Sequence, residues 1–384
     1  MRKSTAQKLQ KSAPKPHRNI GSIDIPFLIL VLLLMGFGLV MVSSASYVSA
    51  YYKYGDSYHY IKRQAIFAAI GIIAMLTIAF FDYRRLKKLA LPLLIVSVIM
   101  LILVLIPGIG IEVNGASRWL GYGAFRFQPS EIGKLAVIIS FSSYISVNYK
   151  NMKKFTVGVL PLVLTLALVA GLVAVETHLS GAILILVIGA ILMFVGGTPI
   201  KWFLGAGAVG AAGLGSIILF TPYMQSRIKI WLDPFSDMQD KGYQTVQSLY
   251  AIGSGGLLGL GLGQSRQKHL YIPEPQNDYI FAITAEELGF VGALLVILLF
   301  VMLIWRGFII AFHSRDKFGS LLVIGIISRV AVQTVLNIAV VTNAIPVTGI
   351  SLPFFSYGGT ALCILLAEMG IVLSVSRFSY LDKS

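Results

Sequence analysis

The chain has 384 residues, of which 57% are hydrophobic and only 12% charged, and its mean hydropathy is +0.82. Because a soluble domain carries about 25% charged residues, this composition excludes a soluble globular protein. A net charge of +15 would indicate nucleic-acid binding in a soluble chain, but here the basic residues stand in short segments beside apolar runs. That pattern is typical of the cytoplasmic loops of membrane proteins, so no nucleic-acid partner is expected.

The chain begins with a basic tail, residues 1–22, which we expect in the cytoplasm; the apolar run after it is too long for a cleaved signal peptide. Apolar runs of about 20 residues cross a ~30 Å hydrocarbon core as helices. The sequence therefore predicts an all-α polytopic membrane protein, with ten transmembrane helices in the domain 23–377 and a cytoplasmic tail, 378–384. The predicted spans are 24–46, 64–81, 88–107, 131–147, 156–175, 181–197, 202–221, 279–305, 319–341 and 359–376. The excess of Lys and Arg in the predicted inner loops favours an N-in, C-in orientation.

Two predicted outer segments, 108–130 and 222–278, are long enough to be functional loops. The second is the large extracellular loop between the seventh and eighth predicted helices. Within it, residues 243–263 pass from amphipathic to glycine-rich sequence, and we expect them to lie in or dip into the outer interface without crossing the membrane. The glycine run does not follow a strand, so it does not predict a nucleotide site.

The first long outer segment and the helix after it supply most of the polar candidates. These are Asn114, Arg118, Gln128, Ser130, Glu131 and Lys134. A lysine beyond the first turn of a membrane helix must extend to the interface or meet an anion, and for Lys134 we favour an anion site. Arg118 fits either an interfacial anchor beside Trp119 or a functional cation. Glu131 fits the positive end of the helix dipole as well as it fits a site.

Acidic residues near or within predicted spans are the next candidates. Asp278 stands at the water–hydrocarbon boundary, and Glu286 and Glu287 lie deeper in the eighth predicted helix. Carboxylates at membrane depth cost about 2.5–3.5 kcal/mol each, so they are functional candidates by default. Asp278 fits both an N-cap and a general base that takes a proton from a hydroxyl, and residue chemistry leaves both open. We expect Arg329, in the middle of the ninth span, to pair with Glu286, Glu287 or Glu368.

Three further features carry weaker signals. Glu176 and His178 bracket a short outer turn and have no partner at metal-ligand spacing, so we favour a structural or substrate-lining function over a metal site. The single cysteine, Cys363, excludes an intramolecular disulfide. Residues 342–359, which include Ser356, form an irregular connection that is tolerated at membrane depth only where it lines a cavity or is buried in protein.

Several segments together resemble the SEDS family (shape, elongation, division and sporulation), whose members are polytopic glycosyltransferases that polymerise lipid II into peptidoglycan. The segments are NGASRW (114–119), FQPSEIGKLAV (127–137), residues 242–290 and IPVTGISLPFFSYGG (345–359). The resemblance covers about residues 20–380, and SRQKHLYIPEPQND (265–278) is more similar to the FtsW and SpoVE branch than to RodA. ETHLSG (176–181) departs from the PDLG-type sequence of many members, which puts any function of that turn in doubt.

The resemblance implies site residues and a reaction. It identifies Asp278 with the family's essential loop aspartate, makes Arg118 and Lys134 important cations, and places Glu286 and Glu287 in a region linked to activity control. Asp278 would take the proton from the acceptor hydroxyl, the reaction would invert the donor sugar, and the two cations would stabilise the departing pyrophosphate. The other predicted substrate-binding residues are Asn114, Gln128, Ser130, Glu131 and Ser356, and the remaining regulatory or structural ones are Arg329 and Glu176.

The resemblance also implies partners and a location. The substrate would be lipid II, and a class B penicillin-binding protein and other divisome proteins would be the partners, at the division septum of the cytoplasmic membrane. No metal site is predicted and no cofactor is assigned; participation of a divalent cation, Mg²⁺ or Mn²⁺, is left open. A lipid II flippase, a non-catalytic scaffold and a sporulation paralogue are the alternatives. The enzyme is favoured because catalytic-type groups concentrate in the outer loops, whereas a transporter would place them midway along several helices.

Overall fold

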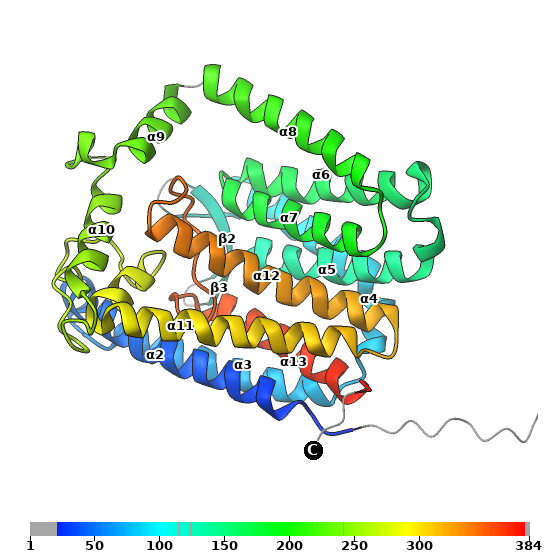
Figure 1. Ribbon diagram of the computed structural model, residues 1–384, viewed down its shortest axis with the longest axis horizontal. Coiled ribbons are helices and arrows are strands. Elements are labelled where there is room, and N and C mark those ends of the chain that lie inside the picture. The colour runs from blue at the N-terminus through cyan, green and yellow to red at the C-terminus, as the bar shows by residue number, and fades with distance from the viewer. Residues whose placement is uncertain (1–20, 114–115, 123–124, 221, 241, 381–384) are drawn as a thin grey trace, which may run out of the picture.

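The computed structural model describes residues 21–113, 116–122, 125–220, 222–240 and 242–380, and it shows a bundle of long helices (Figure 1). The helices are α2 (Ile25–Tyr54), α3 (His59–Phe80), α4 (Leu86–Val104), α5 (Pro129–Asn148), α6 (Leu160–Val175), α7 (Leu179–Val195), α8 (Ile200–Phe220), α9 (Pro222–Leu232), α10 (Tyr243–Gly255), α11 (Ile280–Phe312), α12 (Lys317–Val341) and α13 (Gly359–Arg377). Short 3-10 helices η1 (Tyr83–Arg85), η2 (Tyr149–Asn151) and η4 (Pro234–Asp237) and a π-helical turn η3 (Phe155–Val159) flank them.

Eight helices in the described part of the chain are long and apolar enough to cross a membrane: α2, α3, α4, α5, α6, α11, α12 and α13, three of them with their flanking turns. The protein is therefore a largely α-helical, multi-pass membrane protein. Helices α7 and α8 coincide with the two other predicted spans, and α7 has 17 residues. That all ten helices cross the membrane, and the N-in, C-in orientation, stay predictions. Gly21 N donates to Arg377 O at 2.9 Å, so the described termini meet at one end of the bundle.

A small antiparallel sheet occupies the outer segment 108–130, where the sequence predicted no strands. Its strands are β1 (Ile111–Val113), β2 (Ala116–Tyr122) and β3 (Phe125–Phe127), in the order β1-β2-β3. Ala116 and Leu120 on β2 are buried, and Arg118 stands between them. Because side chains alternate along a strand, Arg118 points to the same side as these two apolar residues.

Helix α11 is interrupted at Gly289, whose φ of 68° and ψ of −168° are not helical. The break frees backbone groups, and four hydrogen bonds of 2.8–3.1 Å join residues 286–291 to the glycine-rich residues 256–261. The stretch 243–263 is therefore the 13-residue helix α10 followed by a loop that returns to the break in α11. Its glycines serve this close backbone contact, which side chains would obstruct.

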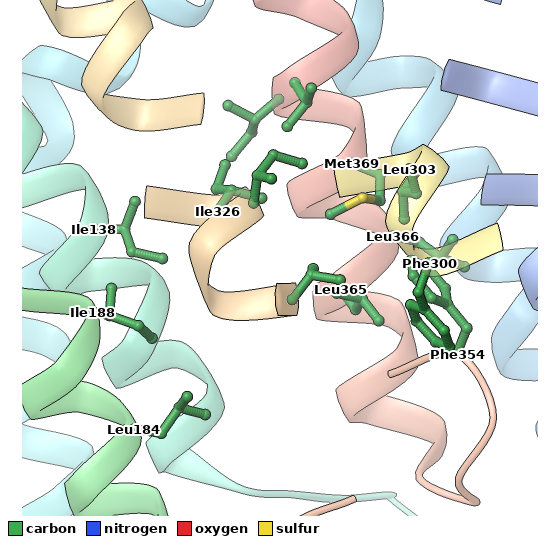
Figure 2. Packing of buried hydrophobic residues seen from close by; sticks show 14 of the residues in the cluster. Ile138, Leu184, Ile188, Phe300, Leu303, Ile326, Phe354, Leu365, Leu366 and Met369 are labelled. Atoms are coloured by element: carbon green, nitrogen blue, oxygen red, sulfur yellow. The ribbon is translucent and has the colours of Figure 1, made fainter. Parts of the chain in front are cut away.

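The apolar core surrounds α12, the most buried of the eight candidate spans. Figure 2 shows Ile326 of α12 between Ile138 of α5 on one side and Leu365 and Met369 of α13 on the other. Because α12 is enclosed by protein, polar side chains along it must be satisfied by neighbouring helices and not by lipid headgroups.

Candidate active site

Asp278 precedes α11, at the end of the bundle opposite the described termini (Figure 1). The N-cap residue of α11 is Tyr279, so the N-cap alternative for Asp278 is wrong; among the described residues none donates a hydrogen bond to its carboxylate. The side chain is partly exposed, and burial raises its pKa to about 6, which Glu274 reinforces and Arg118 opposes. A carboxylate with this pKa is mostly ionised at pH 7 and still basic enough to accept a proton, as a general base requires.

Backbone contacts fix the turn that carries Asp278. Asn337 Nδ2, on α12, donates to Asp278 O at 2.8 Å and to Ile350 O at 2.7 Å. Ser356 Oγ donates at 2.7 Å to the carbonyl of the residue before the aspartate. Gly349 has a φ of 70°, and a Cβ on it would stand 3.4 Å from Asp278 Oδ2. The irregular connection between α12 and α13 thus packs around the aspartate and holds it in place.

Arg118 reaches from β2 toward the turn between α6 and α7. Its Nε donates to Glu176 O at 3.3 Å and its Nη2 to Thr177 O at 2.6 Å, whereas Nη1 has no acceptor among the described residues. Burial lowers the pKa of Arg118, and the carboxyl groups of Glu176 and Asp278 oppose that shift. The structure therefore brings Arg118 within electrostatic range of Asp278 and leaves one end of its guanidinium group for a ligand.

Glu176 lies at the end of α6, before Thr177, which has a φ of 58°. Its side chain is 2% exposed, and neither carboxyl oxygen has a hydrogen-bond partner among the described residues. Burial raises its pKa to about 8, although Arg118 opposes the shift. At pH 7 the group is thus mostly protonated, so it does not cancel the charge of Arg118. Its predicted structural or regulatory function stays a prediction.

His178 closes the same turn and precedes α7. Burial, with smaller contributions from Lys134 and Arg118, lowers the pKa of His178 to about 4, so the imidazole is neutral at pH 7. Its Nδ1 lies 3.2 Å from Nε2 of Gln128, and because an amide nitrogen can only donate, Nδ1 accepts. The predicted substrate-binding residue Gln128 therefore stands beside an uncharged partner.

Four buried charged side chains form a network between α5, α12 and α13. Lys134 Nζ lies 2.6 Å from Glu131 Oε1, and Arg329 bridges Glu131 to Glu368. The prediction that Arg329 pairs with Glu286, Glu287 or Glu368 is confirmed for Glu368, and Arg329 has a second partner, Glu131, that was not predicted. In this structure the anion that Lys134 meets is Glu131. The charges alternate and sum to zero, which compensates the cost of burying each ion.

Two other predicted substrate-binding residues, Ser130 and Ser356, are buried. Ser130 is buried, and its hydroxyl has no hydrogen-bond partner in the described part of the chain. Ser356 is 8% exposed, and its hydroxyl donates to Asn277 O and accepts from Leu352 N, each at 2.7 Å. Asn114 lies outside the described residues. Substrate contact by these side chains stays a prediction.

The two acids of α11 hold the loop that follows α10. Glu287 accepts hydrogen bonds from Ser44 Oγ of α2 at 2.7 Å and from Lys268 Nζ at 2.9 Å. Glu286 accepts hydrogen bonds from Ser265 Oγ and from the backbone N–H of Arg266. Both carboxylates are fully buried, about two turns along α11 from Asp278. Of the two functions predicted for Glu286 and Glu287, regulatory and structural, these contacts favour the structural one.

The described residues do not fit a protein-held metal ion. No group of three or more His, Cys, Asp and Glu stands close enough to hold one in the part of the chain that the structure describes. Glu274, which acts electrostatically on Asp278, is exposed and accepts from Asn277 Nδ2 at 2.9 Å. Mg²⁺ usually keeps several waters and binds through one or two carboxylates together with substrate phosphates, so a divalent ion at this site stays a prediction.

The comparisons with known proteins place the chain in a family. The family model described as "Cell cycle protein", which covers FtsW, RodA and SpoVE, matches residues 25–381. The chain belongs to this family. Stage V sporulation protein E of Bacillus subtilis is 45% identical over 358 residues, 93% of this chain and 98% of that protein. The probable peptidoglycan glycosyltransferase FtsW of Trichlorobacter lovleyi is 39% identical over 362 residues, 94% of this chain and 95% of that protein. The predicted resemblance to the FtsW and SpoVE branch is confirmed.

Solved structures of relatives share the fold of this FtsW/RodA/SpoVE protein. One belongs to a peptidoglycan synthase complex that coordinates polymerization and crosslinking; it has a TM-score of 0.79 and 28% identity over 94% of this chain and 99% of that chain. Another is RodA of Thermus thermophilus, with a TM-score of 0.69 and 28% identity over 94% of this chain and 98% of that chain. The likeness therefore extends over nearly the whole membrane domain.

Sequence reasoning missed the residues that position the aspartate, above all Asn337 and Gly349. An asparagine within a predicted span is an available signal, because polar side chains at membrane depth are functional candidates. Gly349 gave no comparable signal, since its contact with Asp278 appears only when the connection between α12 and α13 is folded.

Proposed function

We propose that this protein is a peptidoglycan glycosyltransferase that polymerises lipid II into glycan strands at the outer face of the cytoplasmic membrane. The observation that carries the proposal is the placement of Asp278, a partly exposed carboxylate with a pKa of about 6, in electrostatic range of a half-buried Arg118. The FtsW relatives are named for this activity, and the synthase complex that shares the fold supports it.

The first part of the reaction is proton transfer to Asp278. The hydroxyl at C4 of the acceptor GlcNAc gives its proton to the carboxylate, and its oxygen attacks C1 of the donor MurNAc. The bond between C1 and the phosphate oxygen breaks as the new glycosidic bond forms, with inversion at C1. Because the leaving group departs as a stabilised anion, one carboxylate is enough, unlike in glycoside hydrolysis.

The second part is stabilisation of the lipid pyrophosphate that leaves. Arg118 has its Nη1 group available for a phosphate oxygen and uses Nε and Nη2 to hold the turn at residues 176–177. A preorganised guanidinium group in a desolvated site stabilises developing charge more than it would in water. Neutral Glu176 leaves that positive charge undiminished, and the network of Lys134 supports the wall of the site from within the bundle.

The test is the Asp278→Asn variant with labelled lipid II and purified protein. We expect loss of glycan elongation by at least about a hundredfold, the usual contribution of a general base. Asp240→Asn, on an exposed loop, is the matched control and should polymerise at the wild-type rate. An Asp278→Asn protein with an unchanged polymerisation rate refutes the base assignment. Transfer of lipid II across vesicles without elongation by the wild type would identify a flippase instead.

We further propose that the enzyme works at the division septum with a class B penicillin-binding protein and other divisome proteins. The synthase complex with the same fold, in which polymerization and crosslinking are coordinated, supports a crosslinking partner. The 45% identity to a stage V sporulation protein favours a sporulation function as the second candidate. Depletion separates them, because loss of septal synthesis blocks division of growing cells and loss of a sporulation enzyme leaves growth intact.

A further inference from the structure

A cavity lined mostly by charged residues lies at the end of the bundle opposite Asp278. It has a volume of about 500 Å³ and is lined by Arg84, Lys87, Ser146, Asp316, Lys317 and Phe318. One of its lining residues shows at which end of the bundle it lies: the guanidinium carbon of Arg84 is 5.1 Å from the ring centre of Phe378, which follows the end of α13. The cavity therefore opens at the ends of α4, α5 and α12, at the level where lipid headgroups stand, on the side that the positive-inside rule assigns to the cytoplasm.

The charge of this cavity is positive and only partly compensated. Its one acid, Asp316, accepts from Gly319 N at 2.8 Å as the N-cap of α12, from the hydroxyl of Tyr83 and from Arg84 Nε at 3.3 Å. Lys87 has no ion-pair partner among the described residues, and Lys317 Nζ lies over the ring of Tyr149, at 2.9 Å from its centre. The lining thus has a formal charge of +2 (three cations and one carboxylate), with both lysines exposed.

A separate apolar groove lies deeper along the same helix. The groove has a volume of about 220 Å³ and is lined by Leu94, Ile95, Val98 and Ile99 of α4 and by Thr165, Leu168 and Val169 of α6. Lys87, Leu94 and Val98 stand at positions i, i+7 and i+11, so they share one face of α4. At 1.5 Å per residue, the groove begins about 10 Å deeper than Lys87, as an acyl chain does below its phosphate.

We propose that this face of α4 binds a phospholipid with an anionic headgroup. The phosphate occupies the cavity beside Lys87 and Lys317, and an acyl chain lies in the groove between α4 and α6. Basic pockets between helices on the cytoplasmic side are suited to anionic headgroups. A free phosphate would satisfy the cavity alone, whereas a lipid accounts for the cations and for the apolar groove on the same helix face.

The experiment titrates the purified full chain in detergent with phosphatidylglycerol, phosphatidylcholine and inorganic phosphate, and native mass spectrometry reads the bound fraction. We expect preference for phosphatidylglycerol over phosphatidylcholine, and about fivefold weaker binding in Lys87→Gln. Lys88→Gln, an exposed neighbour on α4 that does not line the cavity, is the matched control and should bind as the wild type does. Val98→Trp should fill the groove and weaken lipid binding, and Val96→Trp, on the opposite face of α4, should not.

Three results would overturn the proposal. Equal binding of the two lipids removes the headgroup preference, and equal weakening by both lysine variants reduces it to general surface charge. Inorganic phosphate bound as tightly as lipid, with Val98→Trp unaffected, would point to a soluble phosphate compound instead. All four variants lie far from Asp278, so an unchanged rate of lipid II polymerisation shows that they are folded.

Discussion

Replacement of Asp278 by Asn should remove activity and stabilise the fold at the same time. Folding raises the pKa of this carboxyl from 3.8 to about 6, so the folded protein binds the proton more tightly than the unfolded chain does. A raised carboxyl pKa destabilises the fold above that pKa, and the penalty disappears as the pH falls through about 6 to below 3.8. Two pKa units correspond to about 3 kcal/mol. Partial exposure of the side chain reduces the expected gain to about 1–2 kcal/mol at pH 8.

Thermal unfolding of the wild type, Asp278→Asn and Asp240→Asn, at pH 8 and at pH 5 in the same detergent, measures this effect. The Asp278→Asn protein should unfold a few degrees higher than the wild type at pH 8, and the difference should shrink at pH 5. The exposed control should unfold with the wild type at both values. An Asp278→Asn protein that unfolds below the wild type at pH 8 would show that the ionised carboxylate is stabilised by its surroundings, and the reasoning from burial would be wrong.

Three further changes test the site and its support. Glu176→Gln should keep most of the polymerisation rate at pH 7, where the native carboxyl is already mostly neutral. Above pH 8 the wild type should lose rate, because ionised Glu176 offsets the charge of Arg118, whereas the variant should not. A pH–rate profile from about 6 to 9 measures this difference. Arg329→Met should lower the free energy of unfolding by about 3–5 kcal/mol, because buried Glu368 loses its ion-pair partner and Glu131 keeps only Lys134. An unchanged melting temperature contradicts this. Gly289→Ala should cost about 1–3 kcal/mol, since its φ is 68° and a Cβ would lie 2.3 Å from a loop nitrogen. Gly253→Ala, which lies in helix α10 with open space for a Cβ, should melt at or slightly above the wild type.

The helices could be predicted because a run of about 20 apolar residues has few other uses. Each predicted span coincides with a helix, as 319–341 does with α12. The break at Gly289 could not be predicted, because TAEELGFVGALL reads as an ordinary apolar helix. It exists because the glycine-rich residues 256–261 supply partners for the freed backbone groups, and that contact joins segments about 30 residues apart. The strands in 108–130 are likewise stabilised by packing on the bundle, not by local sequence preference.

The sequence predicted which residues belong to the site better than it predicted which of their side chains pair with one another. The resemblance indicated Asp278 and Arg118, and the structure brings them into electrostatic range. The pairing of Lys134 could not be read from the sequence, because the choice between a substrate anion and Glu131 depends on how Arg329, 198 residues from Glu131, divides its contacts. The neutral state of Glu176 was equally hidden, since it follows from burial of the carboxyl group with no hydrogen-bond donor beside it among the described residues.

The charges around the site suggest how one aspartate can be a base beside a cation. Arg118 alone would lower the pKa of Asp278 and weaken it as a base, but burial acts in the opposite direction and is the larger effect, so the pKa is about 6. Glu176 is mostly neutral at pH 7, and the network of Lys134 sums to zero, so neither adds a strong field. In the proposed reaction, Asp278 would be the one negative group facing the acceptor hydroxyl and Arg118 the one positive group facing the leaving diphosphate. Because the same burial strengthens the interaction of Arg118 with an anion, base strength and leaving-group stabilisation rise together instead of competing.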